Sequence, residues 1–217
     1  FITGLPFVSK NNLLKQHNYF KENFFSKKNL YCFLSVSVNR DSHDLYQKFL
    51  FHEQNYKFYK GIEILFDIHN DIINTDEIIL FIKKCVSKNL IIKIWPVHCY
   101  KQLNFKPFLR GSINEVFYII SKINSPIILG GLGCGISNYF FYKNTSKILR
   151  NTYFSSSIPF SPENLKFLNN KLYKRVFFGS DYPFIKSKTF QNIISDQRKY
   201  LPKNKHNNVF NSNIQKF

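Results

Sequence analysis

The sequence has no methionine and only four cysteines, and both shortages narrow the class of protein. Cys32, Cys85, Cys99 and Cys134 form no C-x-x-C pair, and four cysteines in 217 residues is far below the density of a disulfide-stabilised scaffold. We therefore expect free thiols in a reducing compartment, which favours a cytoplasmic location. Because the numbering starts at Phe1 and the chain has no methionine, we expect translation to begin upstream of it.

Long apolar runs are also missing. No stretch approaches the roughly 18 apolar residues that mark a candidate membrane-spanning helix. Residues 1–8 are too few for a signal peptide and lack its basic start. We therefore predict neither a membrane span nor a secretory leader within this sequence.

Acidic residues are scarce: 13 stand against 31 lysines and arginines, which gives a net charge of +18. Such an excess can indicate nucleic acid, an anionic membrane surface or an acidic partner. However, only five of the basic residues are arginine, the usual choice for phosphate recognition, and the lysines are scattered. The 25 phenylalanines and 13 tyrosines have A/T-rich codons, as lysine does. We therefore favour codon bias and do not expect a nucleic-acid partner, so a basic nucleic-acid-binding protein is our third alternative.

The 44% hydrophobic fraction is ample for a core, and the length fits one domain over residues 1–217. Near-continuous apolar runs, typical of covered parallel strands, recur along the chain. They lie at 1–7, 29–38, 59–66, 90–100, 126–131, 152–157 and 175–179.

Helix signals separate these runs. Thr75 precedes an apolar stripe, Ser112 and Glu115 form a capping box, and Ser161 precedes a proline. Segments 42–54 and 187–200 are also expected to be helical. The alternation predicts an α/β fold with a parallel sheet. About seven strands are one fewer than a closed (β/α)8 TIM barrel needs, and a doubly wound open sheet is the alternative. Residues 203–217 are expected to form a loose tail or a final short helix.

Reactive groups in parallel α/β folds gather at the carboxyl ends of the strands. Run 90–100 ends near His98, and run 175–179 is followed by Ser180 and Asp181. Taken alone, His98 is typical of an ordinary structural histidine. Taken alone, Asp181 is typical of an aspartate that caps a turn. Together, an imidazole and a carboxylate at two strand ends favour a divalent-metal site.

The order of these segments resembles the amidohydrolase-related family of metal-dependent barrel hydrolases and decarboxylases. RVFFGSDYP at 175–183 is similar to the family's closing "ri-FGSDyP", and LIIKIWPVHCY resembles its fifth strand. SPIILGGLG resembles the sixth strand "p-iilgHlG". KGIEIL, NTYFSSS and VFNSNIQKF resemble "kGiKl", "nvy-dtS" and the closing "il-gNA-rlf". The resemblance covers essentially the whole chain, from the family's second strand onward.

This resemblance implies a TIM-barrel-like enzyme with a divalent metal, usually zinc, that hydrolyses a small organic substrate. A first-strand H-x-H pair, His98 and Asp181 would bind the metal, and Asp181 would also act as general base. Glu63, His69, Gly131 and Cys134 are expected to lie in the same pocket, with Cys134 an alternative zinc ligand. A homo-oligomer is compatible with the resemblance.

The sequence also departs from the family pattern. It contains no H-x-H, and the missing first strand would lie upstream of Phe1. Gly131 stands where the sixth strand has histidine, and Glu63 stands where the family often has lysine. These departures support the alternative hypothesis of a catalytically degenerate barrel, a pseudoenzyme that serves as a binding or scaffold protein.

Overall fold

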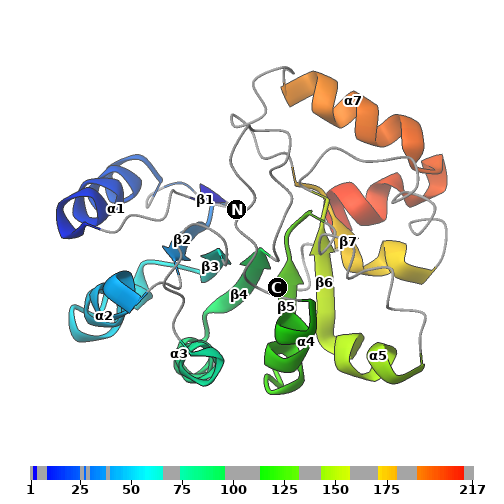
Figure 1. Ribbon diagram of the computed structural model, residues 1–217. Helices are drawn as coiled ribbons and strands as arrows, with labels where there is room; N and C mark the ends of the chain where they lie inside the picture. The colour runs from blue at the N-terminus through cyan, green and yellow to red at the C-terminus, as the bar shows by residue number, and fades with distance from the viewer. Residues whose placement is uncertain are drawn as a thin grey trace, which may run out of the picture. The chain divides into compact units, whose positions relative to one another are not determined.

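Strands and helices alternate along the chain, as the apolar pattern predicts (Figure 1). The computed structural model describes residues 2–3, 9–24, 27, 30–37, 40–65, 74–95, 113–131, 143–156, 171–179 and 190–212. The chain divides into two compact units, Phe1–Ile127 and Ile128–Phe217. Each unit contains parallel strands and helices of its own.

The first unit is built on parallel strands that pair in chain order. These are β1 (Ile2–Thr3), β2 (Cys32–Ser37), β3 (Gly61–Leu65) and β4 (Ile91–Trp95). The helices are α1 (Lys10–Phe24), α2 (Arg40–Gln47), α3 (Thr75–Ser87) and α4 (Ile113–Ser121), with a π-helical turn at Lys48–His52 and a 3-10 turn at Asn55–Lys57. Parallel neighbours joined by helices are repeated β–α–β units.

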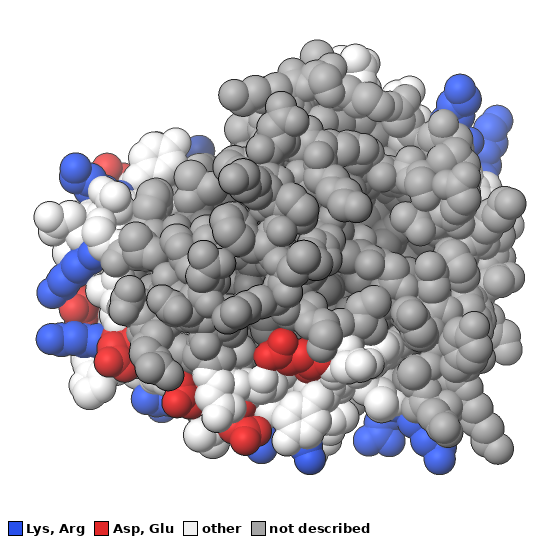
Figure 2. All heavy atoms as spheres, in the orientation of Figure 1, with Lys and Arg blue, Asp and Glu red and all other residues white. Residues whose placement is uncertain are grey.

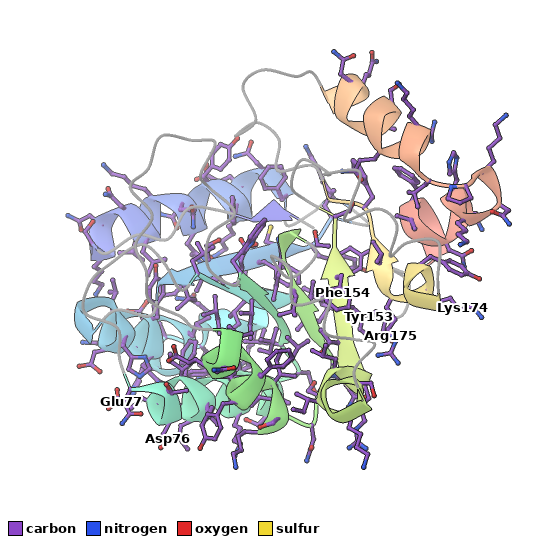
Figure 3. All side chains as sticks on the ribbon, turned by 45° about the vertical axis from the view of Figure 1, so that its right-hand side comes forward. Asp76, Glu77, Tyr153, Phe154, Lys174 and Arg175 are labelled. Atoms are coloured by element: carbon purple, nitrogen blue, oxygen red, sulfur yellow. The ribbon has the colours of Figure 1, made fainter. Side chains whose placement is uncertain are left out.

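Helix α3 begins where its sequence predicts, with a well-formed N-terminal cap. The side chain of Asn74 accepts a 2.9 Å hydrogen bond from the backbone N–H of Asp76. Asp76 and Glu77 lie together in the first turn (Figure 3), where the helix dipole favours negative charge. One side of the helix is fully buried, comprising Ile78, Ile79, Phe81, Ile82 and Cys85.

The register of β2, β3 and β4 sorts their side chains onto two faces. One face is wholly apolar, with each side chain at most 1% exposed: Leu34, Val36, Ile62, Ile64, Ile92 and Ile94. Burying an isoleucine of this kind stabilises the fold by about 1.5–3 kcal/mol. The opposite face carries Ser35, Glu63 and Lys93 at matching register positions. The polar residues of these strands are thus concentrated on one face.

Gly61 lets β3 start close to its neighbours. A Cβ at this position would lie 2.5 Å from Cε1 of Phe33 and closer still to the carbonyl oxygen of Ile91. The strand pairing therefore requires a residue without a side chain here.

The second unit contains parallel strands β6 (Thr152–Ser155) and β7 (Val176–Phe177), paired at Phe154↔Val176 and Ser155↔Phe177. Its helical elements are α5 (Lys143–Ile148), α7 (Phe190–Tyr200) and short turns at Leu149–Asn151, Lys171–Arg175, Lys203–Lys205 and Asn208–Ser212. Strand β5 (Ile127–Leu129) spans the sequence boundary between the units. Arg175, which lies near Tyr153 in Figure 3, donates a 3.1 Å hydrogen bond to the carbonyl of Leu149.

The start of the expected C-terminal tail packs against β7. The backbone N–H of Phe178 donates a 2.9 Å hydrogen bond to the carbonyl of Val209, whose side chain is buried. The rings of Phe178 and Phe210 stack with centroids 5.2 Å apart. Residues 203–212 are thus held in the second unit, while 213–217 lie outside the described residues.

The predicted α/β class with parallel strands is confirmed, and each predicted apolar run contains an observed strand. Closure into a barrel and the single-domain organisation stay predictions. None of the described helices has the length and apolar composition needed to cross a membrane.

Candidate functional site

A row of polar side chains crosses the first unit's strands on one face. Ser35 on β2 is the register partner of Glu63 on β3, and Glu63 is the partner of Lys93 on β4. Ser35 and Glu63 are 0% and 4% exposed. Because buried polar groups destabilise a fold unless they are bonded, this row needs internal partners.

Both carboxylate oxygens of Glu63 are bonded. Ser35 Oγ donates to Oε2 at 3.0 Å, and the indole Nε1–H of Trp95 donates to Oε1. Lys93 Nζ lies 2.5 Å from the same Oε1. With three donors, Glu63 is a satisfied buried carboxylate. Its place in a pocket stays a prediction.

Lys93 is held from two sides. Its ammonium forms the ion pair with Glu63 and lies 5.1 Å from the centroid of the Trp95 ring, within cation–π range. Its side chain keeps 14% of its surface exposed, against 5% for Glu63. The sequence analysis singled out neither Trp95 nor Lys93. The sequence signal that could have identified Lys93 was a single charged residue in each of two otherwise apolar strands.

Gly131 has a positive φ of 55°. This left-handed conformation is strained for residues with a Cβ, so glycine fits the backbone here better than histidine would. The replacement of the family's histidine is therefore accompanied by a local backbone that suits glycine.

The other predicted site residues, His69, His98, Cys134 and Asp181, lie outside the described residues. His98 follows the end of β4 by three positions and Asp181 follows the end of β7 by four. Their convergence stays a prediction.

A second buried polar network lies at the ends of β6 and β7, and sequence reasoning missed it. Ser156 Oγ–H donates to Gln197 Oε1 at 2.7 Å, and the amide of Gln197 donates to the carbonyls of Ser156 and Gly179 at 3.0 and 3.1 Å. The N–H of Gly179 returns a 3.2 Å bond to Ser156 Oγ. The network ties α7 to the segment that leads toward Asp181.

His17 on α1 is a further buried polar residue, and no function was predicted for it. Its Nδ1 lies 3.0 Å from Tyr59 Oη, and the rings of Phe49 and Phe58 meet it edge-on. Burial lowers the pKa of His17, with a further contribution from Lys21, and burial raises the pKa of Tyr59. These contacts identify His17 as a packing residue that is kept neutral.

Within the described ranges, no three His, Cys, Asp or Glu side chains are grouped so that they could hold a metal ion. Glu63 does not fit a ligand role either, because three donors already occupy its oxygens. The described residues by themselves therefore supply no metal centre.

The described surface charges are mixed. Figure 2 shows one face of the molecule, and along its lower left the lysine or arginine side chains are interspersed with acidic ones. A polyanion-binding protein would concentrate one sign. On this face, the described side chains form no such patch.

The comparisons with known proteins support the fold. No protein-family model matches the chain, and no curated protein matches its sequence. Its structure is similar to the crystal structure of 4-oxalomesaconate hydratase LigJ from Rhodopseudomonas palustris, with a TM-score of 0.51 and 13% sequence identity. The match covers 97% of this chain and 85% of that chain. At this identity the likeness shows the fold alone.

Proposed function

We propose that the chain is a TIM-barrel-like, metal-dependent hydrolase of the amidohydrolase type that acts on a small organic substrate. The observation that carries this proposal is the structural likeness to a hydratase over 97% of the chain. In folds with parallel strands and helical crossovers, reactive groups gather at the carboxyl ends of strands, where His98 and Asp181 follow β4 and β7 in the sequence.

In this proposal His98 and Asp181 are two ligands of one divalent metal, taken as zinc. A bound metal of this kind would supply a water whose pKa is lowered to about 7. Asp181 serves as general base, and a general base typically contributes a factor of about 10²–10⁴. The rate factor from Asp181 alone is therefore too small for hydrolysis by this route. Metal binding is the property to test.

The test is zinc binding by the purified protein. We expect stoichiometric zinc by atomic absorption, and we expect its loss in both His98→Ala and Asp181→Asn. His52→Ala and Asp44→Asn, at exposed positions on the first unit, are the matched controls and should keep their zinc. Wild-type protein that takes up no zinc, or variants that bind it normally, would refute the proposal.

Gly131 favours a second candidate function, a degenerate barrel that binds a ligand without metal chemistry. Its positive φ shows a backbone suited to glycine at the position of the family's histidine. This candidate predicts a folded protein that binds no zinc but still binds a small molecule saturably. The zinc measurement therefore separates the two candidates.

A further inference from the structure

The polar row on β2, β3 and β4 contains one group with bonding capacity left. Glu63 already accepts from Ser35, Trp95 and Lys93. An ammonium carries three donors. Within the described part of the chain, Glu63 is the acceptor paired with Lys93. The carboxylate is thus occupied, whereas the ammonium retains donors.

The environment of Lys93 holds it in one position. Its Nζ is fixed between the Glu63 carboxylate and the Trp95 ring, and 14% of its side-chain surface remains exposed. A lysine held in this way loses little further rotamer freedom when it binds a ligand. A bound carboxylate would share the Lys93 ammonium with Glu63, and the chain's net charge of +18 favours the approach of anions.

We propose that Lys93 is the binding group for the carboxylate of a small organic acid, and that Glu63 and Trp95 position it. This assigns Glu63 a positioning role instead of metal or substrate binding. The inference deepens the proposed function and rests on it for the location of the reactive groups. The binding step itself needs no metal.

The chain contains a built-in reporter for this site. Trp95 is its only tryptophan, and the ring centroid lies 5.1 Å from Lys93 Nζ. A carboxylate that binds Lys93 changes the charge next to the indole and therefore its fluorescence. We expect succinate to give a saturable change in the presence of a chelator, and the neutral diamide succinamide to give none.

Variants separate binding from folding. Lys93→Met should weaken succinate binding about tenfold or more, because a hydrogen bond to a charged group is lost. That variant also leaves Glu63 buried without its cation, so the double variant Glu63→Gln/Lys93→Met is needed. It removes both charges and should fold, yet still fail to bind. Glu63→Gln keeps an acceptor oxygen that can hold Lys93 and removes the negative charge beside the bound carboxylate, so it should bind succinate at least as tightly as wild type. Lys83→Met, at an exposed position on α3, should not change binding.

The outcomes are decisive in both directions. A wild-type protein with no saturable response to succinate, or a double variant that binds like wild type, overturns the inference. Saturable binding of inorganic phosphate without binding of succinate overturns the carboxylate assignment. Because the titration contains a chelator, failure of the zinc test leaves this result standing, and failure here leaves the zinc test standing.

Discussion

Gln197 bonds directly to three hydrogen-bonding groups of the second unit. Its amide serves the carbonyls of Ser156 and Gly179 and the hydroxyl of Ser156, and that hydroxyl accepts from Gly179. Gln197 is 4% exposed, so water cannot replace a lost partner. The Gln197 side chain therefore fixes the segment that follows β7.

We expect Gln197→Leu to lower the free energy of unfolding by about 2–4 kcal/mol, because it leaves buried carbonyls without donors. Chemical denaturation with circular dichroism measures this change. Gln191→Leu on the same helix is the matched control, since Gln191 is exposed, and it should change stability by less than about 0.5 kcal/mol. Equal losses in the two variants would contradict the role assigned to Gln197.

At the residue scale, the sequence was a better guide to which residues matter than to which side chains they bond. Glu63 was singled out because it stands where the amidohydrolase-related pattern often has lysine. Its partners Ser35 and Lys93 were missed, because pairing across strands depends on register and a single sequence does not state the register. Gln197 was missed for a similar reason: its partners lie on strands far away in sequence.

Helix α1 illustrates the same limit at the scale of an element. The sequence analysis did not predict this helix, whose buried residues are Leu13, His17 and Phe20. The spacing is helical, but a histidine occupies one position of the buried stripe and weakens the apolar periodicity. Helices α3 and α4 have continuous apolar stripes and were predicted.

The buried histidine makes α1 sensitive to acid. Burial lowers the pKa of His17 from 6.5 in the folded chain, Lys21 lowers it further, and Glu53 acts in the opposite direction. Below about pH 6.5 the unfolded chain takes up this proton before the folded chain does. The free energy of unfolding should therefore fall as pH decreases through 6.5, until the lower folded pKa is reached.

Denaturant titrations between about pH 7.5 and 5 test this expectation. His17→Phe keeps an aromatic ring but cannot titrate, so its stability should depend less on pH than that of wild type. His43 also has a lowered pKa from burial, so part of the pH dependence should remain. An unchanged slope in His17→Phe would show that His17 does not control the acid response.

Over the whole molecule, some of the lysines that contribute to the net charge of +18 pack on aromatic rings. Several lysines lie over aromatic rings of their own unit: Lys84 over Phe51 at 4.3 Å, Lys205 over Tyr173 at 4.8 Å and Lys122 over Tyr118 at 5.1 Å. Their stems cover apolar surface while their charges stay near water. These contacts give the three lysines a packing role within their own units.

The division into two units raises the question of independent folding. The described strands of the second unit are all short: β6, β7 and residues 128–129 of β5. Strands this short give a unit little stability of its own. Strand β5 crosses the boundary, and its three residues are at most 1% exposed. One cooperative domain over residues 1–217 stays a prediction.

Trp95 lies in the first unit and is the only tryptophan, so its fluorescence follows that unit, whereas far-ultraviolet circular dichroism follows the helices of both. We expect the two signals to change at the same denaturant concentration, as two-state unfolding requires. Circular dichroism that keeps changing after the Trp95 transition is complete would show that the units unfold separately. In that case the second unit must be stable without the first.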